Sequence, residues 1–180
     1  MDPVSIIRKH FIPGSPAFTI LVEHSSLVMT KSLAVAGNVM HLSPDLTFIR
    51  EAAMLHDIGI VYVNAPELGC YGKEAYICHG YLGRELLERE GYPRHALVCE
   101  RHVGIGITID DIRAHNLSLP QRDMRPLTIE ERIICYADKF YSKSNGRLHL
   151  EKSVDQARGE LEKFGPDKLA AFDELHRLFQ

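Results

Sequence analysis

The 180-residue sequence lacks several features that would assign the protein to a specialised class. No apolar run approaches the ~20 residues needed to span a bilayer, and Glu23 interrupts one of the longest runs, residues 18–22. Residues 1–13 contain no basic stretch followed by an apolar core, so we expect no secretory signal. These absences predict a cytoplasmic protein with no membrane partner.

An excess of charge of one sign is also missing. The 21 Lys and Arg residues nearly balance the 24 Asp and Glu residues, which leaves a net charge of -3 with neutral histidines. This balance predicts no broad surface for nucleic acid or anionic membranes. The hydrophobic fraction of 45% and the charged fraction of 25% are typical of a globular chain, and the length suits a single domain.

The four cysteines form no Cys-x-x-Cys pair, which argues against a zinc ribbon or a thioredoxin-type motif. Free thiols instead fit a reducing compartment. Histidine, by contrast, is abundant. Ten histidines in a chain of this length are the first indication of metal or proton chemistry.

Sustained two-residue alternation and internal repeats are absent, and residues 58–63 are the only weak candidate for a strand. Apolar residues recur at helical spacing instead, which predicts an all-α bundle. Ser15-Pro16 and Ser43-Pro44 are expected to open the first two helices, the second of which ends at Gly59. Thr128 and Glu131 predict a capping box at another helix start.

Further helices are expected over about residues 75–90 and 94–102, and in the tail over residues 154–179. The chain then divides into an N-terminal arm (residues 1–15), one core domain (16–145) and a C-terminal helical extension (146–180) that packs on the core.

Each expected core helix carries one or two residues that commonly bind metals. The candidates are His24, His56, Asp57, His79, His102 and Asp138. Helical bundles build metal sites from inward side chains of facing helices, and imidazole with carboxylate suits Zn, Fe, Mn or Co. Two His and two Asp could hold one ion. The other two histidines could hold a second ion bridged by Asp57 and a hydroxide, and such a pair would clamp a phosphoryl group.

Residues 56–59 read His-Asp-Ile-Gly. With His24 before them and Asp138 after them, they resemble the HD-domain superfamily of metal-dependent phosphohydrolases, specifically its HDIG-type members. The resemblance covers about residues 18–145. Residues 77–83 and 100–106 look like the segments that carry the third and fourth histidines of binuclear members. The chain is therefore similar to HD enzymes that hydrolyse dinucleoside polyphosphates, and residues 16–145 would form the HD domain.

The sequence departs from the HD enzymes that act on cyclic di-GMP. Gly91-Tyr92-Pro93 lies between the third and fourth histidines at a helix break, and Val103 follows His102 where that class has another histidine. A trinuclear site for a cyclic dinucleotide is therefore not expected.

The resemblance implies a phosphohydrolase that cleaves a phosphoester or phosphoanhydride bond of a nucleotide-like or small phosphorylated substrate through a metal-bound hydroxide. Asp57 and His56 would be the catalytic pair, with two divalent or transition metal ions (Fe, Mn, Co, Zn or Mg) as cofactors. Four basic side chains are candidates for contacting substrate phosphates: Arg101, Lys139, Arg84 and Lys73.

Alternatives remain open at this point. A sensor domain that binds metal or nucleotide without turnover would carry the same ligands, and so would a di-iron HD-type oxygenase. Asp138 could instead form a salt bridge with Lys139 or Arg132. For the oligomeric state, a homodimer is one option.

Overall fold

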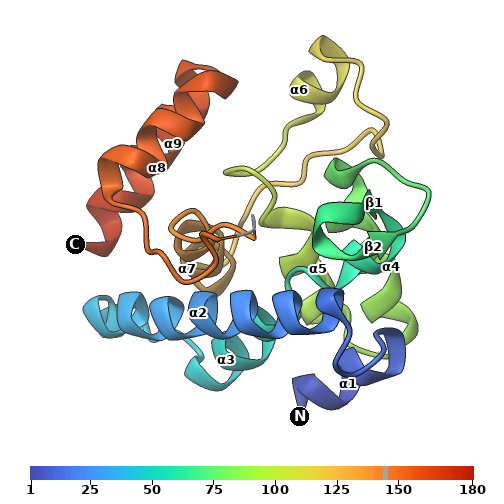
Figure 1. Cartoon of the computed structure of the whole chain (residues 1–180). Coiled ribbons are helices and arrows are strands. Elements are labelled where there is room, and N and C mark those ends of the chain that lie inside the picture. Colours follow the sequence, from blue (N-terminus) through green and yellow to red (C-terminus); the bar gives the residue numbers. More distant parts are fainter. Residues whose placement is uncertain (144–145) are drawn as a thin grey trace.

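A computed structural model describes residues 1–143 and 146–180 and confirms the all-α prediction (Figure 1). In these residues the α-helices are α1 (Pro3–His10), α2 (Pro16–Asn38), α3 (Leu46–Leu55), α4 (His79–Arg89), α5 (Pro93–Arg101), α6 (Ile109–Ala114), α7 (Ile129–Asp138), α8 (Val154–Leu161) and α9 (Pro166–Phe179). None of the helices in the described ranges is both long and apolar enough to cross a membrane.

The connection between α3 and α4 contains short elements rather than a plain loop. In order they are η2 (Ile58–Tyr62), β1 (Asn64–Ala65), η3 (Pro66–Leu68), β2 (Cys70–Tyr71) and η4 (Tyr76–Cys78). The strand candidate at residues 58–63 is therefore wrong, because most of it forms the 3-10 helix η2. β1 and β2 pair antiparallel just beyond it.

The long helix α2 lies across the molecule and contacts α3 and α7 (Figure 1). As predicted, the Ser15 side chain accepts a hydrogen bond from the Phe18 amide, and Pro16 occupies the first turn. Leu21, Val28 and Val35 form a buried stripe at helical spacing, and His24 lies on the same stripe with 0% exposure. The polar imidazole of His24 is thus buried together with the apolar face of α2.

Two apolar clusters meet along α2. The C-terminal half of α2 joins α3, α7 and α9 in one cluster, whose members include Val28, Ile133 and Phe172. The N-terminal half joins α1, η2 and α4 in the other, through Leu21 and Ile58 among others. His24 lies between the two halves, so the candidate ligands gather where both clusters end.

Some helix starts differ from the expectation. The segment expected as an arm contains α1, whose Ile6 and Ile7 are buried in the second cluster. Asp45, not Ser43, caps α3 by accepting a hydrogen bond from the Phe48 amide. At α7 half of the predicted capping box forms: Thr128 accepts from the Glu131 amide, while the Glu131 carboxylate bonds elsewhere.

The C-terminal helices pack on α7 through aromatic rings. Tyr136 of α7 stacks on Phe172 of α9 with ring centroids 5.3 Å apart, and its hydroxyl lies 2.7 Å from His176 Nδ1. In Figure 1, α8, α9 and α6 lie on the same side of α2, and α7 lies between α2 and the pair formed by α8 and α9. α8 packs on α9, and its residues line the same cavity as Asp138 at the C-terminal end of α7. The domain boundaries remain a prediction.

Candidate metal centre

Three of the four predicted histidine ligands are oriented in the same way, by a hydrogen bond from the ring to a backbone carbonyl oxygen three residues earlier. His56 Nδ1 lies 2.7 Å from the Ala53 carbonyl oxygen, His79 Nδ1 lies 2.6 Å from that of Tyr76, and His102 Nδ1 lies 2.8 Å from that of Cys99. A carbonyl can only accept, so Nδ1 donates in each case. The Nε2 atom of a neutral ring then carries a lone pair, which is the form that binds a metal.

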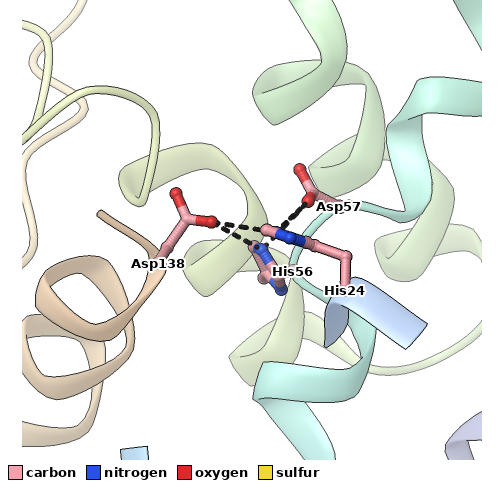
Figure 2. Close-up of side chains that lie close together, drawn as sticks. All are labelled: His24, His56, Asp57 and Asp138. Atoms are coloured by element: carbon pink, nitrogen blue, oxygen red, sulfur yellow. Dashed lines mark hydrogen bonds and ion pairs between the residues drawn. The ribbon is translucent and has the colours of Figure 1, made fainter. Parts of the chain in front are cut away.

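Figure 2 shows the first group of side chains, His24, His56, Asp57 and Asp138, pointing toward one another from α2, the end of α3 and α7. His24 Nε2 lies 3.3 Å from Asp57 Oδ2 and 3.0 Å from Asp138 Oδ1. For His56 Nε2 the corresponding distances are 3.0 Å and 3.4 Å. All four residues are fully or almost fully buried.

The second group shares Asp57 with the first. His79 Nε2 and His102 Nε2 each lie 3.3 Å from Asp57 Oδ1 and 3.2 Å from each other. The structure therefore brings together all six residues that the sequence predicted as ligands. In each group one ligand atom per residue lies within 4.8 Å of all the others.

The contacts of these atoms fit a bound cation better than a hydrogen-bond network. Ligand atoms about 2.1 Å from a metal lie about 3.0 Å apart along an octahedral edge and about 3.4 Å apart along a tetrahedral edge. The ligand separations given above, 3.0 to 3.4 Å, cover this same range. Asp57 Oδ1 is buried and accepts no hydrogen bond of normal geometry from the described residues, although two imidazole nitrogens lie 3.3 Å from it, an arrangement that a cation would satisfy.

Burial and neighbouring charge shift the pKa values of the imidazoles in different directions. Burial lowers the pKa of His79 to about 3, and burial also lowers the pKa of His102, so both rings stay neutral near pH 7. At His56 the effect of burial is outweighed by the Asp57 and Asp138 carboxylates, which raise its pKa to about 9. A cation that occupies the first group would have to displace this proton.

Two lysines border the carboxylates. Lys139 Nζ lies 2.8 Å from Asp138 Oδ2, so the salt bridge considered as an alternative does form, while Oδ1 of the same carboxylate still faces the histidines. Lys143 Nζ lies 2.6 Å from Asp57 Oδ2. Burial opposes the charge of Lys143, but the Asp57 carboxylate outweighs it and raises the pKa of the ammonium group. No sequence motif pointed to Lys143.

The other predicted phosphate contacts lie elsewhere. Arg101 Nη1 donates to both carboxylate oxygens of Glu131, at 2.9 and 3.0 Å. Arg84 lies 2.6 Å from Glu100 and 2.8 Å from Glu88, and Lys73 is exposed ahead of η4. The structure does not bring these three side chains to the metal-ligand cluster.

Two adjoining cavities lead from the cluster to the surface. One, of about 330 Å³, is lined by Asp138, Lys139 and Lys143 together with residues of α8. The other, of about 880 Å³, extends from His79 between the segment at residues 103–107 and the C-terminal region. A substrate in the first cavity would therefore meet Asp138, and one in the second would meet His79.

Gly59, which the sequence suggested as a helix stop, serves close packing instead. A Cβ atom there would lie 2.0 Å from the His79 carbonyl oxygen and 2.5 Å from the Gly83 amide nitrogen. Only glycine lets η2 lie directly on the backbone of α4. This contact places Asp57, just before η2, beside His79, at the start of α4.

Comparisons with known proteins are consistent with this architecture. The sequence model of the HD domain matches residues 21–143. The HD domain of the L. monocytogenes phosphodiesterase PgpH superposes with a TM-score of 0.55, covering 94% of each chain. At 14% sequence identity, this likeness shows a shared fold.

Three curated relatives resemble most of this chain. Proteins named tRNA (cytidine(56)-2'-O)-methyltransferase from Thermoplasma volcanium and Picrophilus torridus are 32% and 35% identical over 77% and 76% of this chain. The chain spans only 36% of the length of each. An uncharacterised protein of Methanocaldococcus jannaschii is 35% identical over 67% of this chain and 65% of its own length. With the family match over residues 21–143, these findings show that the chain belongs to the HD-domain family.

Proposed function

We propose that the protein is a metal-dependent phosphohydrolase that cleaves a phosphoester or phosphoanhydride bond of a small, nucleotide-like phosphorylated substrate. The observation that carries this proposal is the convergence of six buried ligand residues, with contacts spaced like the edges of metal coordination polyhedra, beside a cavity lined by lysines. Family membership and the HD fold support the same class of reaction.

In this proposal His24, His56, Asp57 and Asp138 hold one ion, and Asp57 shares a second ion with the remaining two histidines. Bound metal ions would lower the pKa of a coordinated water and polarise the phosphoryl oxygens. The chain itself supplies the orientation. The backbone carbonyls that accept from the Nδ1 atoms hold three of the rings with Nε2 directed at the cluster.

The charges around the cluster favour a phosphate once cations are present. With neutral imidazoles, the Asp57 and Asp138 carboxylates face the ammonium groups of Lys139 and Lys143, and these charges cancel. Divalent ions would add an uncompensated positive charge at the end of a cavity, where a phosphate dianion is attracted strongly. The two lysines would then neutralise the phosphate oxygens that face the cavity.

The names of the methyltransferase relatives describe proteins of which this chain spans 36%, so we do not extend methyl transfer to it. They motivate the inclusion of RNA-derived nucleotides in a substrate panel. The nucleotide-like part of the proposal rests otherwise on the resemblance to HD hydrolases.

The decisive variant is Asp57→Asn, which keeps the size of the side chain and removes the charge shared by both groups. Asp155→Asn, at an exposed position in the first turn of α8, is the matched control. Both proteins would be purified anaerobically, analysed for metal content, and assayed with phosphomonoesters, nucleotides and dinucleoside polyphosphates under Mn, Fe, Co, Zn and Mg. We expect Asp57→Asn to lose turnover and bound metal while its helical circular dichroism persists.

Three outcomes would overturn the proposal. Full activity in Asp57→Asn would show that the reaction does not require the Asp57 carboxylate. Tight binding of a nucleotide with no turnover under any metal would favour a sensor. Product formation that requires oxygen and releases no phosphate or nucleotide would favour the oxygenase alternative.

A further inference from the structure

The two cavities are parts of one cleft with unlike ends. Tyr76, Gly104, Leu161 and Phe164 line both of them. The narrow end lies at Asp138 and is basic, whereas the wide end begins at His79 and has mostly apolar walls. We infer that the wide end is a subsite for a planar apolar part of the substrate, whose phosphate lies at the narrow end. This inference rests on the proposed function and adds the class of substrate body.

Three lysines and two carboxylates, those of Asp138 and Glu160, line the narrow end, so cationic side chains outnumber anionic ones there. Lys139, Lys143 and Lys152 line its volume of about 330 Å³. The first two already face the cluster carboxylates, and Lys152 pairs with Glu160 of α8 at 2.6 Å. A phosphate fits this charge, whereas an apolar group would remove the lysines from water without compensation.

The wide end has a different character. Val103, Ile105 and Ile107 lie on one wall, and Leu161 and Phe164 belong to the C-terminal wall. Its volume of about 880 Å³ lies within the range typical of small-molecule sites, roughly 300 to 1,000 Å³, and exceeds what a phosphate alone would fill. The substrate therefore has a sizeable body in addition to its phosphate.

Phe164 identifies the chemistry of that body. Its ring belongs to none of the apolar clusters of the described residues and is 69% exposed, yet it lines the cleft at the junction of the two ends. A planar ring packed on Phe164 would bury its face and that of Phe164 together, a contact worth more than area alone when both partners are aromatic. An aryl group or a nucleobase satisfies this requirement.

Polar contacts join the C-terminal wall to the opposite wall, which fixes the width of the subsite. Lys168, in the first turn of α9, forms an ion pair with Asp111 of α6 and donates to the Gly106 carbonyl oxygen at 3.1 Å. These contacts join the two walls beyond Phe164. The aromatic packing of α9 on α7 anchors the same wall from behind.

The test compares full-length wild type with Phe164→Ala, Phe164→Tyr and the control Tyr71→Ala, which removes an aromatic ring that is 79% exposed and does not line the cleft. Each protein is assayed with 1-naphthyl phosphate and methyl phosphate, and with adenosine 5'-monophosphate and ribose 5-phosphate. Equilibrium binding of 1-naphthyl phosphate is measured separately by its fluorescence. Thermal unfolding confirms that each variant folds.

For Phe164→Ala we expect kcat/KM for 1-naphthyl phosphate to fall about fivefold to tenfold through KM, with methyl phosphate unchanged. Phe164→Tyr and Tyr71→Ala should match wild type. A parallel loss for adenosine 5'-monophosphate, but not for ribose 5-phosphate, would identify the body as a nucleobase. If Phe164→Ala shows no loss for adenosine 5'-monophosphate, the body of the substrate would be an aryl group other than a nucleobase.

The two proposals fail in different ways. If no phosphate ester is hydrolysed under any metal, the proposed function is wrong, while the fluorescence titration still tests the subsite. If Phe164→Ala weakens both members of each substrate pair equally, or leaves the binding of 1-naphthyl phosphate unchanged, the subsite is wrong even in an active hydrolase.

Discussion

Replacing Gly59 by alanine tests how the backbone supports the cluster. The added Cβ would lie 2.0 Å from the His79 carbonyl oxygen and 2.5 Å from the Gly83 amide nitrogen, and a real Cβ essentially never approaches within 3.0 Å. Both neighbours belong to the backbone of α4, so no side chain can rotate away. Restoring a 3.0 Å contact with the carbonyl oxygen requires η2 and α4 to separate by about 1 Å.

The expected cost follows from this forced separation. Overpacking a well-packed core costs 1 to 3 kcal/mol and occasionally more, and two blocked backbone segments place Gly59→Ala at about 3 kcal/mol of unfolding free energy. For a chain of this size that corresponds to a fall in Tm of ~6–12 °C. The same displacement would pull Asp57 away from His79, whose facing atoms are 3.3 Å apart. Metal content should therefore fall together with stability.

Gly37→Ala is the matched control, because Gly37 lies in the last turns of α2 with nothing within 4 Å of an added Cβ. That substitution should stabilise the protein by about 0.5 kcal/mol. Both variants would be compared with wild type by calorimetry, with and without chelator, and by metal analysis. A Gly59→Ala protein with the Tm and metal content of wild type would refute the role assigned to this contact.

Three further predictions follow from ion pairs and packing. Lys143→Met should raise KM for a phosphorylated substrate about tenfold while metal content persists, as measured by steady-state kinetics and metal analysis. Lys168→Met should lower Tm by ~2–4 °C, about 1 kcal/mol. Burial acts to raise the pKa of Asp111, but Lys168 outweighs it and lowers that pKa below 3.8, so the Tm difference should be constant above about pH 5 and close as pH falls below 3.8. Phe172→Ala, at a site with 0% exposure, should cost about 3–5 kcal/mol in urea unfolding.

The fold class could be predicted because its signal is local, whereas the six clustered side chains were predicted from their joint order along the chain, which resembles that of the HD family. Apolar spacing marks helices, and a histidine or aspartate on the buried stripe of a helix points inward whatever its neighbours are. His24 is the clearest case, since its position between Leu21 and Val28 decides its direction. The resemblance of the ligand order to that of the HD family then indicated which helices meet.

Other features depend on contacts between distant segments. The packing role of Gly59 is set by the backbone of α4, which no local pattern around residue 59 reveals. Arg101 adjoins His102 in the sequence, but it pairs with Glu131 of α7 because of how α5 and α7 pack. Lys143 lies beyond the end of α7, where helical periodicity no longer constrains it, and only the fold places its ammonium group on Asp57.

The position of Lys143 and Lys139 explains how so many ligand atoms can be buried together. Two carboxylates at the seam of two apolar clusters would be costly without positive partners, and the two lysines supply these partners within 2.6 to 2.8 Å. The metal-free chain can therefore fold with its imidazoles already in place. Lys139 contacts Oδ2 of Asp138 while Oδ1 faces His24, so binding a cation at Oδ1 need not break that ion pair. Lys143 contacts Oδ2 of Asp57, which also faces His24 and His56, so a cation in the first group would share this oxygen with the lysine. The two ammonium groups that permit folding thus also line the cavity, where the proposed reaction places the phosphate.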